Sequence, residues 1–471
     1  MAHRNVILIL TDQQRFDTLG CNGSTVARTP NLDRLAVGGV NFGNHIVANP
    51  VCSPSRGCIM TGRHTTEHGL WANGCTLPRH EITMPMAMHR HGFQTAHFGK
   101  LHLEPILNRV NPPHAYGFEV AEIAEGDQML THDAYFSWLR QKSPDLFVKY
   151  LTEMYEKGHA NGYTSGLPEE LHLSRWITDR SIDYLQNRRR DEQPFFLSMG
   201  YFDPHHAFNP VEPYAGEFAN VDVPPPLFDE AGLASKPPHY QAAAKGMSKI
   251  TRDLEQILRV RQAYHAMCAH IDVCIGRLLE TLTFLGLADD TVVLFSADHG
   301  ELLGEHGLLW KGPFLLDELL RVPMIAAIPG KPLGSGVKVD SVTSAVDLMA
   351  TVQSVAGIEP DAVLFGSGRP MLDADLSPLP QGPRDYALCE WENDKNNNPD
   401  SSLRCLRTAT HKLVHYNLAD DGELYDLLAD PREVTNLFHD PGFAEVRKDL
   451  ERQLQSHYLS RRPPTLRTAG W

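Results

Sequence analysis

Residues 6–12, VILILTD, decide the fold class of this chain. The first five are apolar and partly β-branched, which is typical of a strand that is buried on both faces of a parallel sheet. In open α/β sheets, ligands gather at the carboxyl ends of the strands. We therefore expect a central parallel strand that delivers Asp12 to a site at the sheet edge.

Further strands and helices alternate along the chain from this first strand. We expect strands at residues 93–98, 195–199, 291–297 and 324–328, and helices at 29–36, 85–91, 169–188 and 254–285. Strands that alternate with helices predict an α/β fold. The fold class is therefore a large mixed, mostly parallel β-sheet that is sandwiched by helices.

The pattern changes after Gly366, where the apolar runs become shorter. Residues 385–391, 403–408 and 412–416 read as antiparallel strands, and a helix follows near 441–459. We place a domain boundary near residue 370. The predicted domains are a large α/β domain over residues 1–370 and a smaller C-terminal α+β domain over 371–471, which ends in a basic, proline-containing tail at 461–471.

The composition excludes several classes of partner. The 471 residues include 43 Lys and Arg against 58 Asp and Glu, a formal net charge of −15. Nucleic acids and anionic membrane surfaces attract clustered basic residues, so we expect neither as a partner. No apolar run approaches the ~18 residues of a spanning helix, and the run at 6–10 is too short for a secretory signal. Eight cysteines in so long a chain favour free thiols and a cytoplasmic protein.

Carboxylates follow two of the expected strands. Asp12 and Gln13 follow residues 6–10, and Asp298 and His299 follow residues 291–297. Although distant in sequence, these residues can converge at one edge of a sheet, where they would form an oxygen-rich set suited to a hard divalent cation. The alternative is that the two aspartates are only turn and cap residues.

Residues 52–63, CSPSRGCIMTGR, form the second chemical element. Pro54 can occupy the first turn of a short helix that Gly62 ends. A helix N-terminus favours an anion, and Arg56 adds a planar, charged fork. Cys52 therefore lies where an anionic group would be held. The alternative is that Cys52 is a small buried thiol.

Residues 52–56 (CSPSR), continued to 61–63 (TGR), resemble the signature of the type I sulfatases, whose fold belongs to the alkaline phosphatase superfamily. Other blocks follow in the family's order: 11–13 (TDQ), 99–102 (GKLH), 203–206 (DPHH), 298–300 (DHG), 310–312 (WKG) with 321–323 (RVP), and 424–427 (LYDL) with 430–431 (DP) and 436–437 (NL). The resemblance implies an arylsulfatase-like sulfuric ester hydrolase that releases sulfate from an alcohol or phenol.

The resemblance also implies that a formylglycine-generating enzyme oxidises Cys52 to formylglycine, the aldehyde 3-oxoalanine. The hydrated aldehyde is a geminal diol, of which one metal-activated hydroxyl attacks sulfur and the other is deprotonated to expel sulfate. Residue 52 would share one divalent metal ion with Asp12, Gln13, Asp298 and His299. Many sulfatases carry Asp where the neutral Gln13 stands. We expect calcium as the metal ion, with manganese or magnesium as alternatives.

Basic residues of the same blocks receive roles from the resemblance. Arg56 would hold the diol and the sulfate. Lys100 and Lys311 would neutralise charge on the sulfate and on the bridging oxygen. Asn73, which lies outside those blocks, would contact the transferred group.

Three histidines are candidates for proton transfer. His205 would be the general acid for the leaving alcohol, with its neighbour His206 as the alternative. His102 would assist deprotonation of the diol. Taken alone, each of these histidines could equally be a hydrogen-bonded loop residue.

Two other functions compete with this prediction. One is a phosphonate monoester or phosphodiester hydrolase of the same superfamily, with activity on both ester classes as a further option. The pair Lys100 and His102 resembles sulfatases, which favours sulfate. The other is a non-catalytic metal-binding or oxyanion-binding protein with an unmodified Cys52. We expect a small-molecule aryl, alkyl or sugar sulfate as substrate, and a homodimer or homotetramer.

Overall fold

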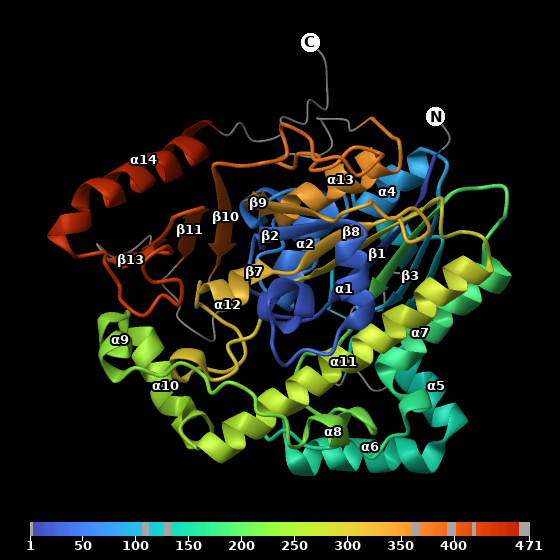
Figure 1. Cartoon of the computed structure of the whole chain (residues 1–471), viewed down its shortest axis with the longest axis horizontal. Coiled ribbons are helices and arrows are strands. Elements are labelled where there is room, and N and C mark those ends of the chain that lie inside the picture. Colours follow the sequence, from blue (N-terminus) through green and yellow to red (C-terminus); the bar gives the residue numbers. More distant parts are fainter. Residues whose placement is uncertain are drawn as a thin grey trace.

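The computed structural model describes residues 3–105, 113–126, 133–359, 367–392, 402–416 and 421–460. Within these residues a nine-stranded sheet has the order β4-β3-β5-β1-β6-β8-β2-β7, with β9 paired to β2 (Figure 1). Its strands are β1 (Asn5–Thr11), β2 (Val40–Ile46), β3 (Gln94–Gly99), β4 (Val120–Ile123), β5 (Phe195–Gly200), β6 (Thr291–Ala297), β7 (Arg321–Val322), β8 (Met324–Ala327) and β9 (Val337–Ser344). The predicted large, mixed sheet is confirmed.

Strand β1 is central because it pairs in parallel with β5 on one side and with β6 on the other. Successive side chains of a strand point to opposite faces of the sheet. Val6, Leu8 and Leu10 enter one apolar core, and Ile7 and Ile9 enter a second core on the other face. Both faces of the strand are therefore buried, as its uninterrupted apolar sequence predicts.

Helices cover both faces of the sheet. The core around Ile7 and Ile9 includes residues of α1 (Pro30–Val37), α7 (Leu173–Asp183) and α11 (Leu254–Phe284), the long helix that crosses the lower part of Figure 1. The opposite core includes residues of α2 (Cys52–Thr61), α4 (Met84–Arg90) and α13 (Leu348–Val355). The sheet is thus sandwiched, as expected.

The expected helix at 169–188 is interrupted near its start. A 3-10 turn, η4 (Glu169–Leu171), precedes α7, and a π turn, η5 (Tyr184–Arg188), follows it. His172 between η4 and α7 has an extended backbone, and its ring accepts a hydrogen bond from the Ser174 amide. The histidine therefore caps α7 instead of continuing a helix.

The chain toward the C-terminus forms a separate antiparallel sheet, seen at the left of Figure 1. Its strands are β10 (Tyr386–Trp391), β11 (Leu403–Thr408), β12 (His411–Tyr416) and β13 (Gly422–Asp426), and α14 (Ala444–Ser460) packs against it. The antiparallel sheet was expected, but its fourth strand was not. The domain boundary near residue 370 stays a prediction, and the tail at 461–471 lies outside the described residues.

Further helices surround these two sheets. They are α3 (Thr65–His68), α5 (Ala134–Lys142), α6 (Pro144–Lys157), α8 (Tyr214–Phe218), α9 (Glu230–Ser235), α10 (Pro238–Thr251) and α12 (Asp317–Leu320). None of the eight cysteines, all of which lie within the described residues, forms a disulfide bond. Among the described helices, none combines the length and the apolar character that a bilayer crossing needs.

Candidate active site

Four neighbouring parallel strands, β3, β5, β1 and β6, end at one edge of the large sheet. The predicted residues directly follow these strands: Lys100 and His102 after β3, His205 after β5, Asp12 and Gln13 after β1, and Asp298 and His299 after β6. Helix α2 adds Cys52, its first residue, and Arg56. The topology thereby explains why residues from distant parts of the chain meet.

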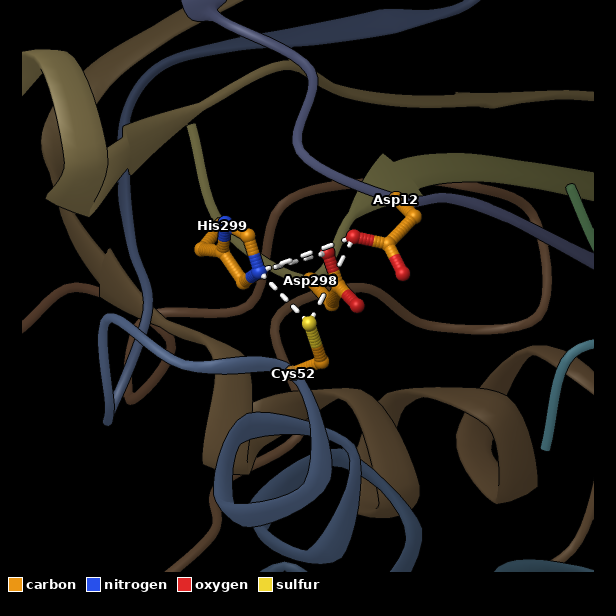
Figure 2. A group of neighbouring side chains, drawn as sticks. All are labelled: Asp12, Cys52, Asp298 and His299. Atoms are coloured by element: carbon orange, nitrogen blue, oxygen red, sulfur yellow. Dashed lines mark hydrogen bonds and ion pairs between the residues drawn. The ribbon is translucent and has the colours of Figure 1, made fainter. Parts of the chain in front are cut away.

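Figure 2 shows the centre of this site, formed by Asp12, Cys52, Asp298 and His299. The Cys52 Sγ lies 3.6 Å from Asp12 Oδ1 and 3.2 Å from His299 Nε2. The same His299 nitrogen lies 3.6 Å from Asp12 Oδ1 and 3.7 Å from Asp298 Oδ1. All four residues are buried, so their ligating atoms face one another in a site largely withdrawn from solvent.

This donor set fits a divalent metal ion. Two carboxylates and one imidazole offer converging oxygen and nitrogen atoms, with the residue 52 side chain as a fourth ligand. Burial raises the pKa of Asp12, but Lys100 and then other nearby cations lower it well below its ordinary value. Asp12 is therefore a carboxylate, the form that binds a metal.

Buried cations hold these carboxylates in place. Lys100 Nζ lies 2.5 Å from Asp12 Oδ2. Arg56 Nε donates to Asp298 Oδ2 at 2.7 Å, and its Nη1 donates to the Lys100 carbonyl at 2.6 Å. Burial lowers the pKa of Lys100, but Asp12 raises it above its ordinary value, so the ammonium keeps its charge. Arg56 thus contacts the carboxylates, and its expected contact with sulfate stays a prediction.

Gln13 is oriented by hydrogen bonds on every side. Its backbone N–H donates to Asp298 Oδ1 at 3.0 Å, and its side-chain Oε1 accepts from Lys311 Nζ at 2.6 Å. Because an ammonium can only donate, the other end of the side chain must be the NH₂ group. That Nε2 donates to Glu301 and to His206 Nδ1, the latter at 3.1 Å.

These bonds distinguish the two adjacent histidines. Since Gln13 Nε2 can only donate, His206 Nδ1 must accept, and a proton added there would break the bond. His205 Nδ1 instead faces the His206 carbonyl, so it donates and leaves Nε2 open to protonation. The geometry favours His205 as the proton donor to the leaving group. Burial lowers the pKa of both rings well below the ordinary value. The next largest cause is the neighbouring His206 in the case of His205, and the charge of Lys311 in the case of His206.

Glu125 is a site residue that sequence reasoning missed. His102 has a left-handed backbone, with φ 55°, and its N–H donates to Glu125 Oε1 at 2.8 Å. The Leu101 N–H reaches the same oxygen at 3.3 Å. Glu125 lies two residues after β4, a strand that was not expected from sequence, so the rule that identified Asp12 after β1 did not reach it.

Asn73 and Glu301 support the site from outside its centre. The Asn73 Oδ1 accepts a hydrogen bond from the Ser53 amide at 3.0 Å, directly beside Cys52. Glu301 is fully buried and accepts from the Leu303 and Trp310 amides, in addition to Gln13. Asn73 therefore lies next to the first turn of α2, and Glu301 joins Gln13 to the loop that carries Lys311.

Comparisons with known proteins agree with this geometry. Residues 4–358 match the family model described as sulfatase, and residues 304–459 match one described as N-sulphoglucosamine sulphohydrolase, C-terminal. An arylsulfatase of Clostridium perfringens is 31% identical over 96% of this chain and 94% of its own length. A multifunctional alkaline phosphatase superfamily protein of Trinickia caryophylli, PehA, is 28% identical over 99% of this chain and 97% of its length.

Similarity extends to solved structures. The crystal structure of a phosphonate monoester hydrolase of Agrobacterium radiobacter is 27% identical in sequence. It matches 97% of this chain and 95% of its own chain with a TM-score of 0.82. The similarity covers both sheets, so the whole described fold has a close counterpart.

Proposed function

Because this chain belongs to the sulfatase family and is a sulfuric ester hydrolase, we propose that it cleaves small-molecule sulfate esters with residue 52 as the nucleophile. The observation that carries the proposal is the position of Cys52. Its Sγ lies at the N-terminus of α2 and faces Asp12 and His299, within the cluster that fits a metal ion. The family in general uses a metal ion and a formylglycine derived from cysteine.

We propose that the metal is held by Asp12, Asp298 and His299 together with residue 52, and that it is calcium rather than manganese or magnesium. The Gln13 Oε1 has a second lone pair besides the one used by Lys311 and is the further candidate ligand. A divalent ion here would supply Lewis-acid activation of a hydroxyl group and withdraw charge from sulfate oxygens. The test is metal analysis of the purified protein, followed by chelation and re-addition of each ion. Recovery with manganese alone would contradict the calcium proposal.

The side chain of residue 52, once converted to the hydrated aldehyde, would offer one hydroxyl for attack and a second for release of sulfate. Lys100 and Lys311 both approach the Asp12 carboxylate, at 2.5 and 3.9 Å. Their ammonium groups would neutralise the charge of the transferred sulfate. His102 would accept a proton from the diol. Arg56 would hold the Asp12 and Asp298 carboxylates, the proposed metal ligands, in position relative to each other.

His205 would donate the proton that the leaving group requires. As the bond between sulfur and the bridging oxygen breaks, the proton moves from His205 Nε2 to that oxygen and the alcohol or phenol departs. Burial and nearby positive charge lower the pKa of His205 in the free site. A sulfate ester monoanion bound beside the ring would raise that pKa again and favour the acid form.

The second candidate function is phosphonate monoester hydrolysis, which the structural match to the Agrobacterium radiobacter hydrolase favours. A site built for a tetrahedral oxyanion could accept both ester classes. The test compares kcat/KM for an aryl sulfate and an aryl phosphonate monoester with the same leaving group. We expect the sulfate to be preferred, and a large preference for the phosphonate would overturn this ranking.

We also propose a cellular setting for the enzyme. Eight unpaired cysteines support a reducing compartment, and we place the protein in the cytoplasm. A formylglycine-generating enzyme would mature it, and the mature enzyme would be a homodimer or homotetramer. Light scattering after gel filtration measures the assembly, and a monomer at micromolar concentration would contradict that last part.

A further inference from the structure

Asp203 lies two residues before His205, yet it has no part in the site as described so far. The chain passes from the end of β5 through Asp203 toward His205. The Ser174 hydroxyl donates to Asp203 Oδ2 at 2.7 Å, and His172 Nδ1 lies 3.7 Å from the same oxygen. All three side chains are buried. The carboxylate is therefore fastened to the N-terminus of α7.

A second histidine, His270 on α11, lies next to His172. The rings of His270 and His172 have centroids 5.1 Å apart, and His270 Nε2 lies 3.2 Å from Glu169 Oε1. Burial lowers the pKa of His270, but Cys274, then Glu169 and Asp203, raise it to about 10. A positive charge thus faces the buried Asp203 carboxylate from the opposite helix.

His172, Asp203 and His270 form a cluster whose ligating atoms lie within 4.8 Å of one another, which is close enough to hold a cation. However, one ring nitrogen of each histidine is already committed to a protein group. His172 Nδ1 accepts from the Ser174 amide at 3.3 Å, and His270 Nε2 pairs with Glu169. The contacts therefore describe a closed hydrogen-bonded anchor and not an open ligand set.

The anchor acts on a tight turn that ends at His205. The His205 N–H donates to the Phe202 carbonyl at 3.1 Å, and the two rings lie 4.6 Å apart. Phe202 also lies 5.0 Å below the Lys100 ammonium. Asp203 lies within this turn, so its hydrogen bond with Ser174 fixes the position of the turn relative to α7.

We propose that Asp203 is a positioning residue that, through the hydrogen bond it accepts from Ser174, holds His205 where it can protonate the leaving group. This inference rests on the proposed role of His205 as the acid. Proton transfer requires hydrogen-bond distance between donor and acceptor, and a shift of about 1 Å can cost about 100-fold in rate. Esters with good leaving groups need little protonation, so a displaced acid harms them less.

A comparison of esters with good and poor leaving groups therefore distinguishes a positioning role of Asp203 from a general contribution to stability. The test variants are Ser174→Ala, which removes only the hydroxyl, and Asp203→Asn, which removes only the charge. The matched control is Thr178→Val, one turn further along α7. Thr178 is a buried hydroxyl that bonds to Tyr201 at 2.8 Å, so its loss also loosens the contact between α7 and the end of β5.

The measurement is kcat/KM for 4-nitrophenyl sulfate and for phenyl sulfate, whose leaving group is poorer. For Ser174→Ala and Asp203→Asn we expect about a tenfold loss with phenyl sulfate and less than about threefold with 4-nitrophenyl sulfate. Thr178→Val should reduce both by the same factor. Equal losses on both esters in the two test variants would overturn the proposal.

His205→Ala distinguishes a failure of this inference from a failure of the proposed function. If that variant shows the larger loss with phenyl sulfate and the Asp203 and Ser174 variants do not, the acid is correct and the anchor is only structural. If His205→Ala itself loses equally on both esters, His205 is not the acid, and the positioning role falls with it.

Discussion

The role of the Gln13 side chain follows from the residues that it contacts. An amide at this position, where many sulfatases carry Asp, looks from sequence like a weakened metal ligand. In the structure its oxygen faces Lys311 and its nitrogen faces the buried Glu301 and His206. The amide is therefore required by the groups on its two sides, because a carboxylate could not donate to Glu301.

The first prediction exchanges this amide for an acid. Gln13→Glu would place two carboxylates together and remove both donated hydrogen bonds, so we expect kcat/KM to fall by about 100-fold with a lower melting temperature. Adding Glu301→Gln should recover part of the loss, since one donor then returns to the pair. A double-mutant cycle on kcat/KM measures this coupling. Strict additivity of the two changes would contradict the assigned contact.

The metal-site candidates could be predicted because they follow strands of strongly apolar sequence, whereas Lys100, His102, His205, Lys311 and Asn73 were identified only through the resemblance to the sulfatases. Asp12 and Asp298 stand at such strand ends, and Cys52 stands in a recognisable helix start. Glu125 and Asp203 received no role, because what they do depends on contacts made across the fold. Glu125 binds the backbone of His102, and Asp203 binds Ser174. A single sequence does not display which backbone N–H a distant carboxylate will meet.

At the scale of elements, the left-handed turn after β3 depends on β4. Glu125 follows β4 and accepts from the amides of Leu101 and His102, while Asp133 accepts from the Glu125 amide at 2.8 Å. Two buried carboxylates in series thus connect this turn to the start of α5.

The second prediction concerns this turn. Glu125→Ala leaves two buried N–H groups without an acceptor, so we expect at least about a tenfold loss of kcat with the protein still folded. Glu125→Gln keeps an acceptor oxygen and should retain most of the activity. Steady-state kinetics with circular dichroism measure both. Equal activity of the Ala and Gln variants would show that the turn does not need the acceptor.

The contact between η4 and α11 carries the third prediction. His270 has its pKa raised to about 10, against about 6.5 for an ordinary histidine. A raised pKa means that the stabilisation is complete below about pH 6.5 and is lost as the pH rises toward 10.

The difference in melting temperature between the wild type and His270→Gln should therefore be large at pH 6.5 and shrink by pH 10. Calorimetry at both values measures it. The groups that face His270, and whose charges therefore contribute to this difference in melting temperature, are Glu169, His172, Asp203, Tyr214 and Cys274. A difference that does not change with pH would contradict a charged His270.

One strand of the large sheet, β2, was missed from sequence for a physical reason. Strand β2 contains Asn41, Asn44 and His45, which interrupt its apolar character. These polar groups find partners elsewhere, such as Thr343 for His45 at 3.0 Å. Periodicity of apolar residues cannot reveal a strand whose polar side chains are satisfied by distant neighbours.

At the scale of the whole molecule, the C-terminal sheet is tied to the active site. Lys412 on β12 is fully buried and forms ion pairs with Glu433 and with Asp317, the latter at 3.3 Å. Asp317 begins α12, whose Leu319 carbonyl accepts from the Gly300 amide at 2.9 Å. Gly300 directly follows His299, so the small sheet supports the segment that carries the proposed metal ligands Asp298 and His299.

The fourth prediction tests this tie. Lys412→Met would leave the buried Glu433 without its cation, while Asp317 keeps its pair with Arg407 at 2.9 Å. Removing one partner of a buried ion pair typically costs about 3–5 kcal/mol. Urea unfolding at pH 7 measures the change in free energy. Arg404→Met, on the neighbouring strand β11 but paired with the partly exposed Glu392, is the control and should cost less than about 1 kcal/mol. Equal costs would show that the buried pair does not hold the sheet.

The central claim is that residue 52 works as an aldehyde and not as a thiol. The fifth prediction follows from it and uses the tryptic peptide spanning residues 35–56, which holds Cys52 as its only cysteine. In active enzyme produced together with a formylglycine-generating enzyme, mass spectrometry should find the peptide with CHO in place of CH₂SH, and a hydrazide probe should label it. A fully active preparation in which this peptide carries only the unmodified thiol would contradict the account.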